Sequence, residues 1–184
     1  MDAIEVKSPL SDEVISKLKI GQKVLLTGTI YTARDAAHKK IVTAINNGEK
    51  YGFDITGQTV YYAGPCPAKP GSPIGPVGPT TSGRMDNYTP LLLQNGLKAM
   101  IGKGFRNSEV KKAVKDNCSV YFVAVGGAGA YYMNCVKSAE FVAFEELGTE
   151  AVRKLTVEKM PLIVALDIHG GDIYQQAQHV MSEN

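Results

Sequence analysis

The chain has 184 residues, 44% of them hydrophobic and 21% charged, and its 20 basic and 18 acidic side chains give a formal net charge of +2. This composition is that of an ordinary soluble globular protein, and the absence of a basic run argues against a nucleic-acid partner. No apolar stretch approaches the ~20 residues of a membrane helix, and the first residues are acidic where a signal peptide is basic, so we expect a cytoplasmic protein that does not enter a membrane.

The first part of the chain alternates between patterns typical of helices and strands. Residues 1–22 are interpreted as an N-terminal adapter segment with a short helix that starts near Ser11. Residues 23–33 are rich in β-branched side chains and predict a strand, and apolar spacing over 35–47 predicts a helix. A second strand is expected over 58–63.

A long loop follows over residues 64–79, with six prolines and four glycines. A loop of this length is too long for an idle connection in a compact domain. Its proline density and its single charged residue, Lys69, favour an ordered, stiff wall over a flexible linker.

The second half continues the alternation. A helix is expected over 83–95, and Pro90 inside it predicts a kink or a division into two. The later expected elements are a strand over 97–101, a helix over 108–116, a strand over 119–125, an open or helical glycine-rich segment over 126–135, a strand over 141–144, a helix over 149–154, a strand over 161–167 and a helical tail from Tyr174. Alternation without internal repeats predicts an α/β or mixed architecture in one domain.

Three cations stand at bends of the chain. Arg34 lies at a strand-to-helix junction, Arg84 lies in the segment 78–86, and Lys103 lies between two glycines. Helix N-termini attract anions, arginine binds carboxylates through a planar fork, and lysine adds a point charge. If the three side chains converge, they form a pocket for a dicarboxylate.

Each of these residues also has an alternative interpretation. Arg34 alone fits a surface helix residue, Lys103 a solvated side chain, and Arg84 a partner for Asp86. The run 80–82 fits a helix cap, which is the usual role of such residues. The dicarboxylate hypothesis therefore depends on the three cations together.

His38 and the glycine cluster are ambiguous. His38 lies four residues after Arg34, on the same helix face, so it either reaches the same ligand or is an exposed histidine beside two lysines. The segment 126–130 does not have the spacing of a dinucleotide-binding loop, and we interpret it as close backbone packing or a pocket wall.

The three cysteines are far apart and form no paired motif. Cys66, Cys118 and Cys135 are odd in number, so neither a disulfide framework nor a zinc or iron–sulfur site built by this chain alone is expected. We expect no metal ligand in this chain.

The segment 78–86, GPTTSGRMD, resembles the signature loop of the C-terminal domain of class I fumarases and of the β subunit of L-tartrate dehydratases. Other segments stand in the family's order over about residues 24–167, namely ARDAAH at 33–38, YAGPCPAKPG at 62–71, the pair Lys103-Gly104 and FEELG at 144–148. The resemblance implies a swivelling β/β/α domain, with a mixed sheet and flanking helices, over residues 23–168 and a tail over 169–184.

The same resemblance implies a β subunit of a [4Fe-4S]-dependent hydro-lyase that adds water to, or removes it from, a C4 dicarboxylate. Fumarate and malate are the first candidates, and L-tartrate and oxaloacetate the next. The cluster would be ligated by a partner α subunit and not by this chain, so that the enzyme is active only as an obligate heteromer of α2β2 type.

Carried over by position, the resemblance gives Thr80 the role of catalytic base or of a residue that orients water. It gives the substrate carboxylates to Arg34, Thr81, Arg84 and Lys103, with Asp35, His38 and Asp86 supporting them. Two other functions compete with this one. They are a non-catalytic module that binds carboxylate or phosphate metabolites, and an assembly subunit with a vestigial pocket. Because the candidate substrates differ by one hydroxyl or methyl, the sequence does not choose among them.

Overall fold

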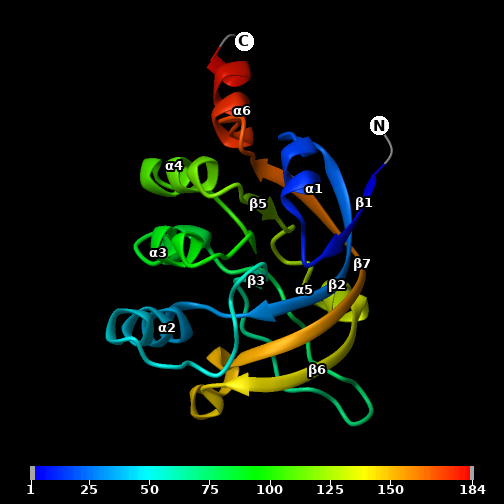
Figure 1. The fold of residues 1–184 in the computed structure, drawn as a ribbon. Helices are drawn as coiled ribbons and strands as arrows, with labels where there is room; N and C mark the ends of the chain where they lie inside the picture. The colour runs from blue at the N-terminus through cyan, green and yellow to red at the C-terminus, as the bar shows by residue number, and fades with distance from the viewer. Residues whose placement is uncertain (1–2, 183–184) are drawn as a thin grey trace.

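The computed structural model describes residues 3–182 of the chain (Figure 1). Its strands are β1 (Ile4–Ser8), β2 (Lys23–Thr32), β3 (Thr59–Tyr61), β4 (Ala99–Gly102), β5 (Val120–Val123), β6 (Val136–Ala143) and β7 (Val152–Leu166). Its α-helices are α1 (Asp12–Lys17), α2 (Asp35–Asn47), α3 (Thr89–Gln94), α4 (Ser108–Asp116), α5 (Gly129–Cys135) and α6 (Ile173–Ser182), and two 3-10 helices are η1 (Ser82–Met85) and η2 (Glu145–Glu150).

Two long antiparallel strands organise the single sheet. β2 pairs with β7 from Lys23–Ile163 to Thr32–Arg153. The other edge of β2 carries β1 along its first half and β3 at its end, both parallel to it. The other edge of β7 carries β6 and then β5, both antiparallel. Because β3, β4 and β5 are parallel neighbours, the sheet returns to its own start as a partly closed barrel. The expected mixed α/β fold is confirmed.

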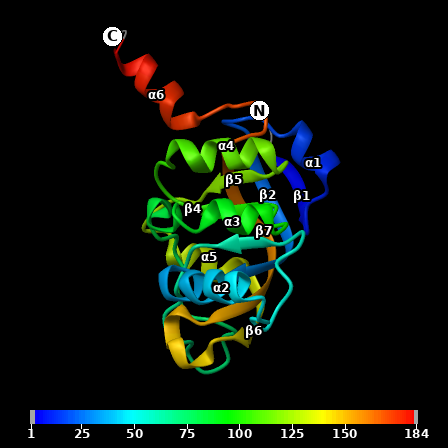
Figure 2. The same ribbon diagram turned by 60° about the vertical axis from the view of Figure 1, so that its left-hand side comes forward.

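The helices cover both faces of this sheet. α2, α3 and α4 are stacked on one side, at the left of Figure 1 and in front in Figure 2. α1 and α5 pack on the other side, against a separate buried cluster. Successive strand residues alternate between the two clusters, as Tyr61 and Tyr62 or Tyr121 and Phe122 do, because side chains of a strand point to opposite faces in turn. Across residues 3–182, every helix is too short or too polar to span a bilayer.

The expected helix over 149–154 is wrong. The chain is helical only to Glu150, and β7 begins at Val152 and runs without interruption to Leu166. Pro161 does not break this strand, because it lies between the part paired with β6, which ends at Val157, and the part paired with β5, which begins at Ile163. Prolines are tolerated where a strand edge lacks a ladder partner.

Two other expectations are refined by the fold. The expected helix over 83–95 is divided into η1 and α3, and Pro90 occupies the first turn of α3, where its missing N–H costs nothing. The adapter segment contains β1 as well as the expected helix, so part of it belongs to the sheet.

The proline-rich loop over 64–79 is folded back on itself. The Cys66 amide donates to the Pro76 carbonyl at 2.9 Å, and a side chain on Gly75 would meet the Cys66 carbonyl oxygen at 2.3 Å. The Tyr61 hydroxyl donates to the Val77 carbonyl at 2.8 Å. Between this loop and the sheet lies a cavity of about 390 Å³, which Cys66, Phe141 and others line. The loop is therefore a shaped wall, as its proline content predicts.

Gly28 marks the closest approach of β1 to β2. The register of β2 against β7 shifts between Leu26 and Gly28, and Gly28 has φ of +125°, a region that L side chains rarely adopt. A Cβ at this position would lie 2.1 Å from the Ser8 carbonyl oxygen. Glycine at this bulge of β2 therefore leaves room for Ser8 at the end of β1.

We predict that Gly28→Ala lowers the free energy of unfolding far more than Gly21→Ala does. Both glycines have positive φ, but a Cβ on Gly21 would meet nothing within 4 Å. We expect about 1–2 kcal/mol from backbone strain alone at Gly21, and roughly 3 kcal/mol or more at Gly28, where β1 must also move. Urea unfolding of both variants measures the difference, and equal losses would contradict the close approach.

Candidate functional site

The carboxyl ends of four neighbouring strands meet at one edge of the sheet. β2, β3, β4 and β5 are parallel in that order, and ligands of open α/β sheets bind beyond such ends. Arg34 follows β2 and Lys103 follows β4, and the segment that leads from Thr80 to Arg84 is hydrogen-bonded to Tyr62 just after β3. The fold therefore brings the three predicted cation positions to the same edge.

Arg34 and Arg84 are joined by one carboxylate. Asp35 Oδ1 lies 2.8 Å from Arg84 Nε, and Asp35 Oδ2 lies 3.5 Å from Arg34 Nε. On its other side, Arg34 Nη2 lies 3.1 Å from Glu150 Oε1. Two guanidiniums thus alternate with two carboxylates, and these link the start of α2 to η1 and η2. The interpretations of Arg34 as an isolated surface residue and of Arg84 as a partner of Asp86 do not hold.

Glu150 also caps helix α2. Its Oε2 accepts a hydrogen bond from the Ala36 amide at 2.8 Å, while Arg34, the N-cap residue, makes no side-chain cap of its own. A carboxylate is stabilised at a helix N-terminus by the free amides and the helix dipole. A side chain on Gly64 would approach Arg34 Nη1 to 3.0 Å, so the loop packs directly on this arginine. The sequence interpretation missed Glu150, because its partners are more than a hundred residues away in the chain.

The segment that carries Thr80 and Thr81 is tied to the ends of β3 and β4. The Thr80 amide donates to the Tyr62 carbonyl at 2.7 Å, and Thr81 forms an isolated parallel bridge with Lys103. Thr80 Oγ1 lies 3.5 Å from Arg84 Nη1, at the long limit of a hydrogen bond. The predicted helix cap over 80–82 is wrong, since η1 begins without a side-chain cap.

Lys103 lies against the glycine-rich segment. A Cβ on Gly126 would lie 3.6 Å from Lys103 Nζ, so the small residue leaves room for the lysine. The Val77 amide donates to the Gly129 carbonyl at 3.1 Å, and Gly129 packs closely on Gly78. Close packing therefore explains the cluster over 126–130. No acidic side chain within residues 3–182 forms an ion pair with Lys103, which leaves its charge available to a ligand.

The site is open and incompletely satisfied. The side chain of Arg84 is 50% exposed, and those of Arg34 and Asp35 are 27% and 32% exposed. In the described part of the chain, the buried side-chain atoms without a hydrogen-bond partner are Arg34 Nε, Asp35 Oδ2 and His38 Nε2. Arg34 Nε and Asp35 Oδ2 face each other at 3.5 Å in the ion pair described above, at the long limit of a hydrogen bond, and the His38 ring is enclosed by Tyr62 and Tyr88.

His38 is not the exposed helix histidine that one interpretation expected. Its ring is fully buried against Tyr62, edge to face at a centroid distance of 5.2 Å, and its Nδ1 lies 3.0 Å from the Arg34 carbonyl oxygen. Because a carbonyl only accepts, Nδ1 carries the proton and Nε2 a lone pair. Burial, and to a lesser degree Arg106, lowers the pKa of His38 from its ordinary 6.5 to about 4, against the opposing effect of the Arg34 carbonyl. The imidazole is therefore neutral near pH 7.

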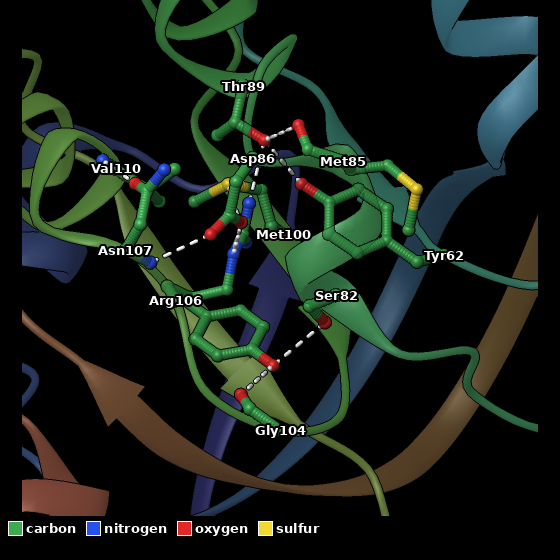
Figure 3. A network of polar contacts seen from close by, with 11 residues as sticks. Tyr62, Ser82, Met85, Asp86, Thr89, Met100, Gly104, Arg106, Asn107 and Val110 are labelled. Atoms are coloured by element: carbon green, nitrogen blue, oxygen red, sulfur yellow. Dashed lines mark hydrogen bonds and ion pairs between the residues drawn. The ribbon is translucent and has the colours of Figure 1, made fainter.

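Asp86 supports an arginine that the sequence did not single out. Its Oδ1 accepts from Arg106 Nε at 2.6 Å, and both side chains are buried (Figure 3). Arg106 lies three residues after Lys103, just before α4, in a stretch without a recognisable motif. Only the fold reveals that its partner is Asp86, two residues after Arg84.

The cysteines of this chain do not fit an iron–sulfur cluster. Cys66 is exposed on the proline-rich loop, Cys118 is half-buried, and Cys135 is buried with its thiol pKa raised by burial. Within residues 3–182, no group of three or more histidine, cysteine or acidic side chains is arranged to hold a metal ion. A cluster would need ligands from another polypeptide or domain.

A family model described as fumarase C-terminus matches residues 1–177. The chain belongs to this family. Among the relatives of this fumarase C-terminal domain, "Putative L(+)-tartrate dehydratase subunit beta" of Methanocaldococcus jannaschii is 39% identical over 180 residues, which cover 95% of this chain and 92% of the relative. "Fumarate hydratase class I, aerobic" of Escherichia coli K12 is 36% identical over 179 residues, and "Fumarate hydratase 2" of Leishmania major is 36% identical over 177 residues.

The two kinds of relative differ in length. The matches cover 95% and 94% of this domain but only 33% of the Escherichia coli protein and 31% of the Leishmania protein. The fumarase C-terminal domain thus spans about a third of the fumarate hydratases that it matches, and nearly all of the tartrate dehydratase β subunit.

We predict that the protein loses stability in mild acid because His38 is buried in its neutral form. The pKa of His38 is lower in the folded than in the unfolded chain, so the unfolded state binds more protons as the pH falls from 6.5 towards 4. The loss is about 2 kcal/mol between pH 7 and pH 5 and ceases below the folded-state pKa.

Urea unfolding at a series of pH values measures this loss. His38→Leu should flatten the profile in this range, although it also removes the bond to the Arg34 carbonyl and so lowers the overall stability. A wild-type profile that is flat from pH 7 to pH 5 would contradict the neutral, buried state of His38.

Proposed function

We propose that this chain is the β subunit of a hydro-lyase that reversibly adds water to a C4 unsaturated dicarboxylate. The observation that supports it most is the meeting of Arg34, Arg84 and Lys103 at the carboxyl edge of the sheet, with Lys103 free of any acidic partner among the described residues. Membership of the fumarase C-terminal family and the names of its relatives support the same reaction class.

The cations suit both ends of a dicarboxylate. Arg84 presents a partly exposed guanidinium whose Nε is already oriented by Asp35, which leaves its outer nitrogens for a substrate carboxylate. Lys103 adds a second positive charge, and the backbone of Thr81 is bridged to it. A rigid cation does not need to reorganise when charge grows on a bound carboxylate, so it stabilises the transition state.

Thr80 is the residue that we assign to proton transfer at the substrate carbon, directly or through a water molecule that it orients. A threonine hydroxyl is a poor base in water and needs a cationic site from which water is excluded. Thr80 Oγ1 lies beside Arg84 Nη1, and its backbone is fixed by Tyr62. Removal of a proton next to a carboxylate places negative charge on that carboxylate, which the two arginines and Lys103 would neutralise.

A partner subunit would cover the open site. Phe105, Val125 and Tyr131 are 57%, 63% and 59% exposed, and they lie in the segments that follow β4 and β5. Exposed apolar side chains around a polar site mark contact surfaces. We propose that the partner is an α subunit in an α2β2 assembly and that it ligates the [4Fe-4S] cluster, which would supply a Lewis acid. Fumarate and malate are the first candidate substrates, and L-tartrate is the second.

The test is an anaerobic co-purification of the native chain, followed by an iron assay and by assays of malate and L-tartrate dehydration. We expect a cysteine-rich, iron-bearing partner and dehydratase activity that neither subunit has alone. Full activity from the isolated, iron-free chain would disprove the proposal. A chain that purifies alone and binds dicarboxylate or phosphate, with no change when Thr80 is replaced by Val, would instead support a non-catalytic binding module.

We predict that Arg84→Met in the complete complex lowers kcat/KM by the equivalent of about 2–4 kcal/mol, because a preorganised carboxylate contact is lost. Arg84→Lys should recover only part of this loss, since lysine lacks the planar fork. Lys112→Met, which removes a charge from the exposed face of α4, is the control and should leave the kinetics unchanged. Wild-type kinetics in both Arg84 variants would rule out this role of Arg84.

A further inference from the structure

Asp86, Arg106 and Thr89 form a buried polar network (Figure 3) in the segments that follow Arg84 and Lys103. The Arg106 side chain is 0% exposed, and its Nε donates to Asp86 Oδ1 at 2.6 Å while its Nη2 donates to Thr89 Oγ1 at 2.7 Å. The second Asp86 oxygen accepts from the Asn107 amide at 2.7 Å. Both oxygens of the Asp86 carboxylate therefore accept a hydrogen bond.

Two tyrosine rings flank the guanidinium of Arg106. Its central carbon lies 5.3 Å from the ring centre of Tyr62 and 5.0 Å from that of Tyr121. Burial alone would lower the pKa of Arg106, but the electrostatic interactions with Tyr62 and Asp86 outweigh it and the pKa is raised. The residue is thus charged inside the protein. A buried ion pair of this kind is no more stabilising than a well-packed apolar core, so its value lies in fixing one arrangement of its neighbours.

The neighbours that it fixes are the two segments carrying the cations of the site. Asp86 follows Arg84 by two residues at the end of η1, and Arg106 follows Lys103 by three residues after β4. The Asp86–Arg106 pair therefore ties the η1 segment to the segment after β4. A second tie runs through the backbone, since the Ser82 amide donates to the Lys103 carbonyl at 2.8 Å.

Tyr121 makes a third tie between the same two segments. Its hydroxyl lies 2.8 Å from Ser82 Oγ and 2.9 Å from the Gly104 carbonyl oxygen. The carbonyl can only accept, whereas the serine hydroxyl can also donate, so one phenol oxygen can serve both partners. Ser82 Oγ is also tightly packed against the backbone of β4, because a Cβ on Gly102 would lie 2.0 Å from it.

We propose that Arg106 and Tyr121 are positioning residues that fix the distance between Arg84 and Lys103, and so set the site to the length of its dicarboxylate. Neither side chain touches the substrate, and both act through the two segments that they join. The inference rests on the proposed function, because it assumes that Arg84 and Lys103 bind the two ends of one ligand. Arg106 and Tyr121 lie outside the family's signature loop and outside the other segments that resemble the family.

The kinetic test uses the complete α–β complex with Tyr121→Phe, which removes one hydroxyl and keeps the ring over Arg106. Loosening of the segments moves the two cations away from the substrate carboxylates, so KM rises, and kcat falls as well because the cations are less preorganised for the transition state. We expect KM to rise on the order of tenfold, the effect of losing about one buried hydrogen bond. Arg106→Lys keeps the charge but not the fork, and should raise KM at least as much.

Ser8→Ala is the matched control. It also removes one buried hydroxyl, which donates to the Thr29 carbonyl at 2.6 Å and lies 2.9 Å from Thr59 Oγ1 at the start of β3, the opposite end of that strand from the site. This variant should lower the melting temperature and leave KM unchanged. A KM that rises equally in the control and in Tyr121→Phe would show a general loss of stability and overturn the positioning role.

Amide hydrogen exchange on the full 184-residue chain provides a readout that does not need catalysis. In Tyr121→Phe and Arg106→Lys, peptides covering residues 80–86 and 102–106 should exchange faster, while peptides from β2 and β7 should not. If Arg106→Lys does not fold, Tyr121→Phe alone decides.

The two proposals fail in different ways. If the wild-type complex has no dehydratase activity, the proposed function is wrong. The hydrogen-exchange result then still tests whether Arg106 and Tyr121 hold the two segments together. An active wild-type complex whose Tyr121→Phe variant keeps both its KM and its exchange rates would overturn the positioning role and leave the proposed function intact.

Discussion

β2 and β7 run antiparallel to each other over almost the whole length of β2, and every other strand of the sheet joins one of these two directly or through a neighbour. The outer edge of β2 pairs first with β1 and then with β3, and the outer edge of β7 pairs first with β6 and then with β5. Because β4 joins β3 to β5, the seven-stranded sheet closes partly on itself. The end of β2 leads to Arg34 and the start of β7 follows Glu150, so the pairing of the two strands brings this arginine and this carboxylate together. The ion pair between Arg34 and Glu150, which are far apart in the sequence, thus follows from the pairing of β2 with β7.

The arginines of the site are of two physical kinds. Arg106 is buried, hydrogen-bonded and flanked by aromatic rings, and its charge is paired with Asp86 inside the protein. Arg84 is half exposed, with its Nε oriented by Asp35 and its Nη1 3.5 Å from Thr80 Oγ1. A charge that is oriented but still unsaturated is the kind that can bind a ligand, whereas a saturated one can only shape the surroundings. Sequence position does not separate the two, since both lie within three residues of a glycine.

Local signals predicted a large part of this structure. Helix α2 was expected over the residues that it occupies, because its apolar spacing, its acidic first turn and Gly48 in the left-handed conformation all act within one segment. The bends that carry Arg34, Arg84 and Lys103 were visible for the same reason. Strand β7 was misjudged, because what keeps residues 152–157 extended is pairing with β2 and β6, not their own propensity. His38 was equally ambiguous, since its burial depends on Tyr62 from a distant strand, and Arg106 gave no local signal of its partner Asp86.

The proline-rich loop has a thermodynamic consequence for assembly. Its two arms are joined by the hydrogen bond from Cys66 to Pro76, its inner turn has no room for a side chain at Gly75, and Val77 is bound to Gly129. Such a segment gives up little conformational entropy when another protein covers it, whereas a flexible glycine–serine segment of equal length would lose roughly 1–2 kcal/mol for each residue that becomes ordered. A surface shaped before the encounter can form a tight complex through a modest contact area, and most of the ordering cost has then already been met when this chain folds.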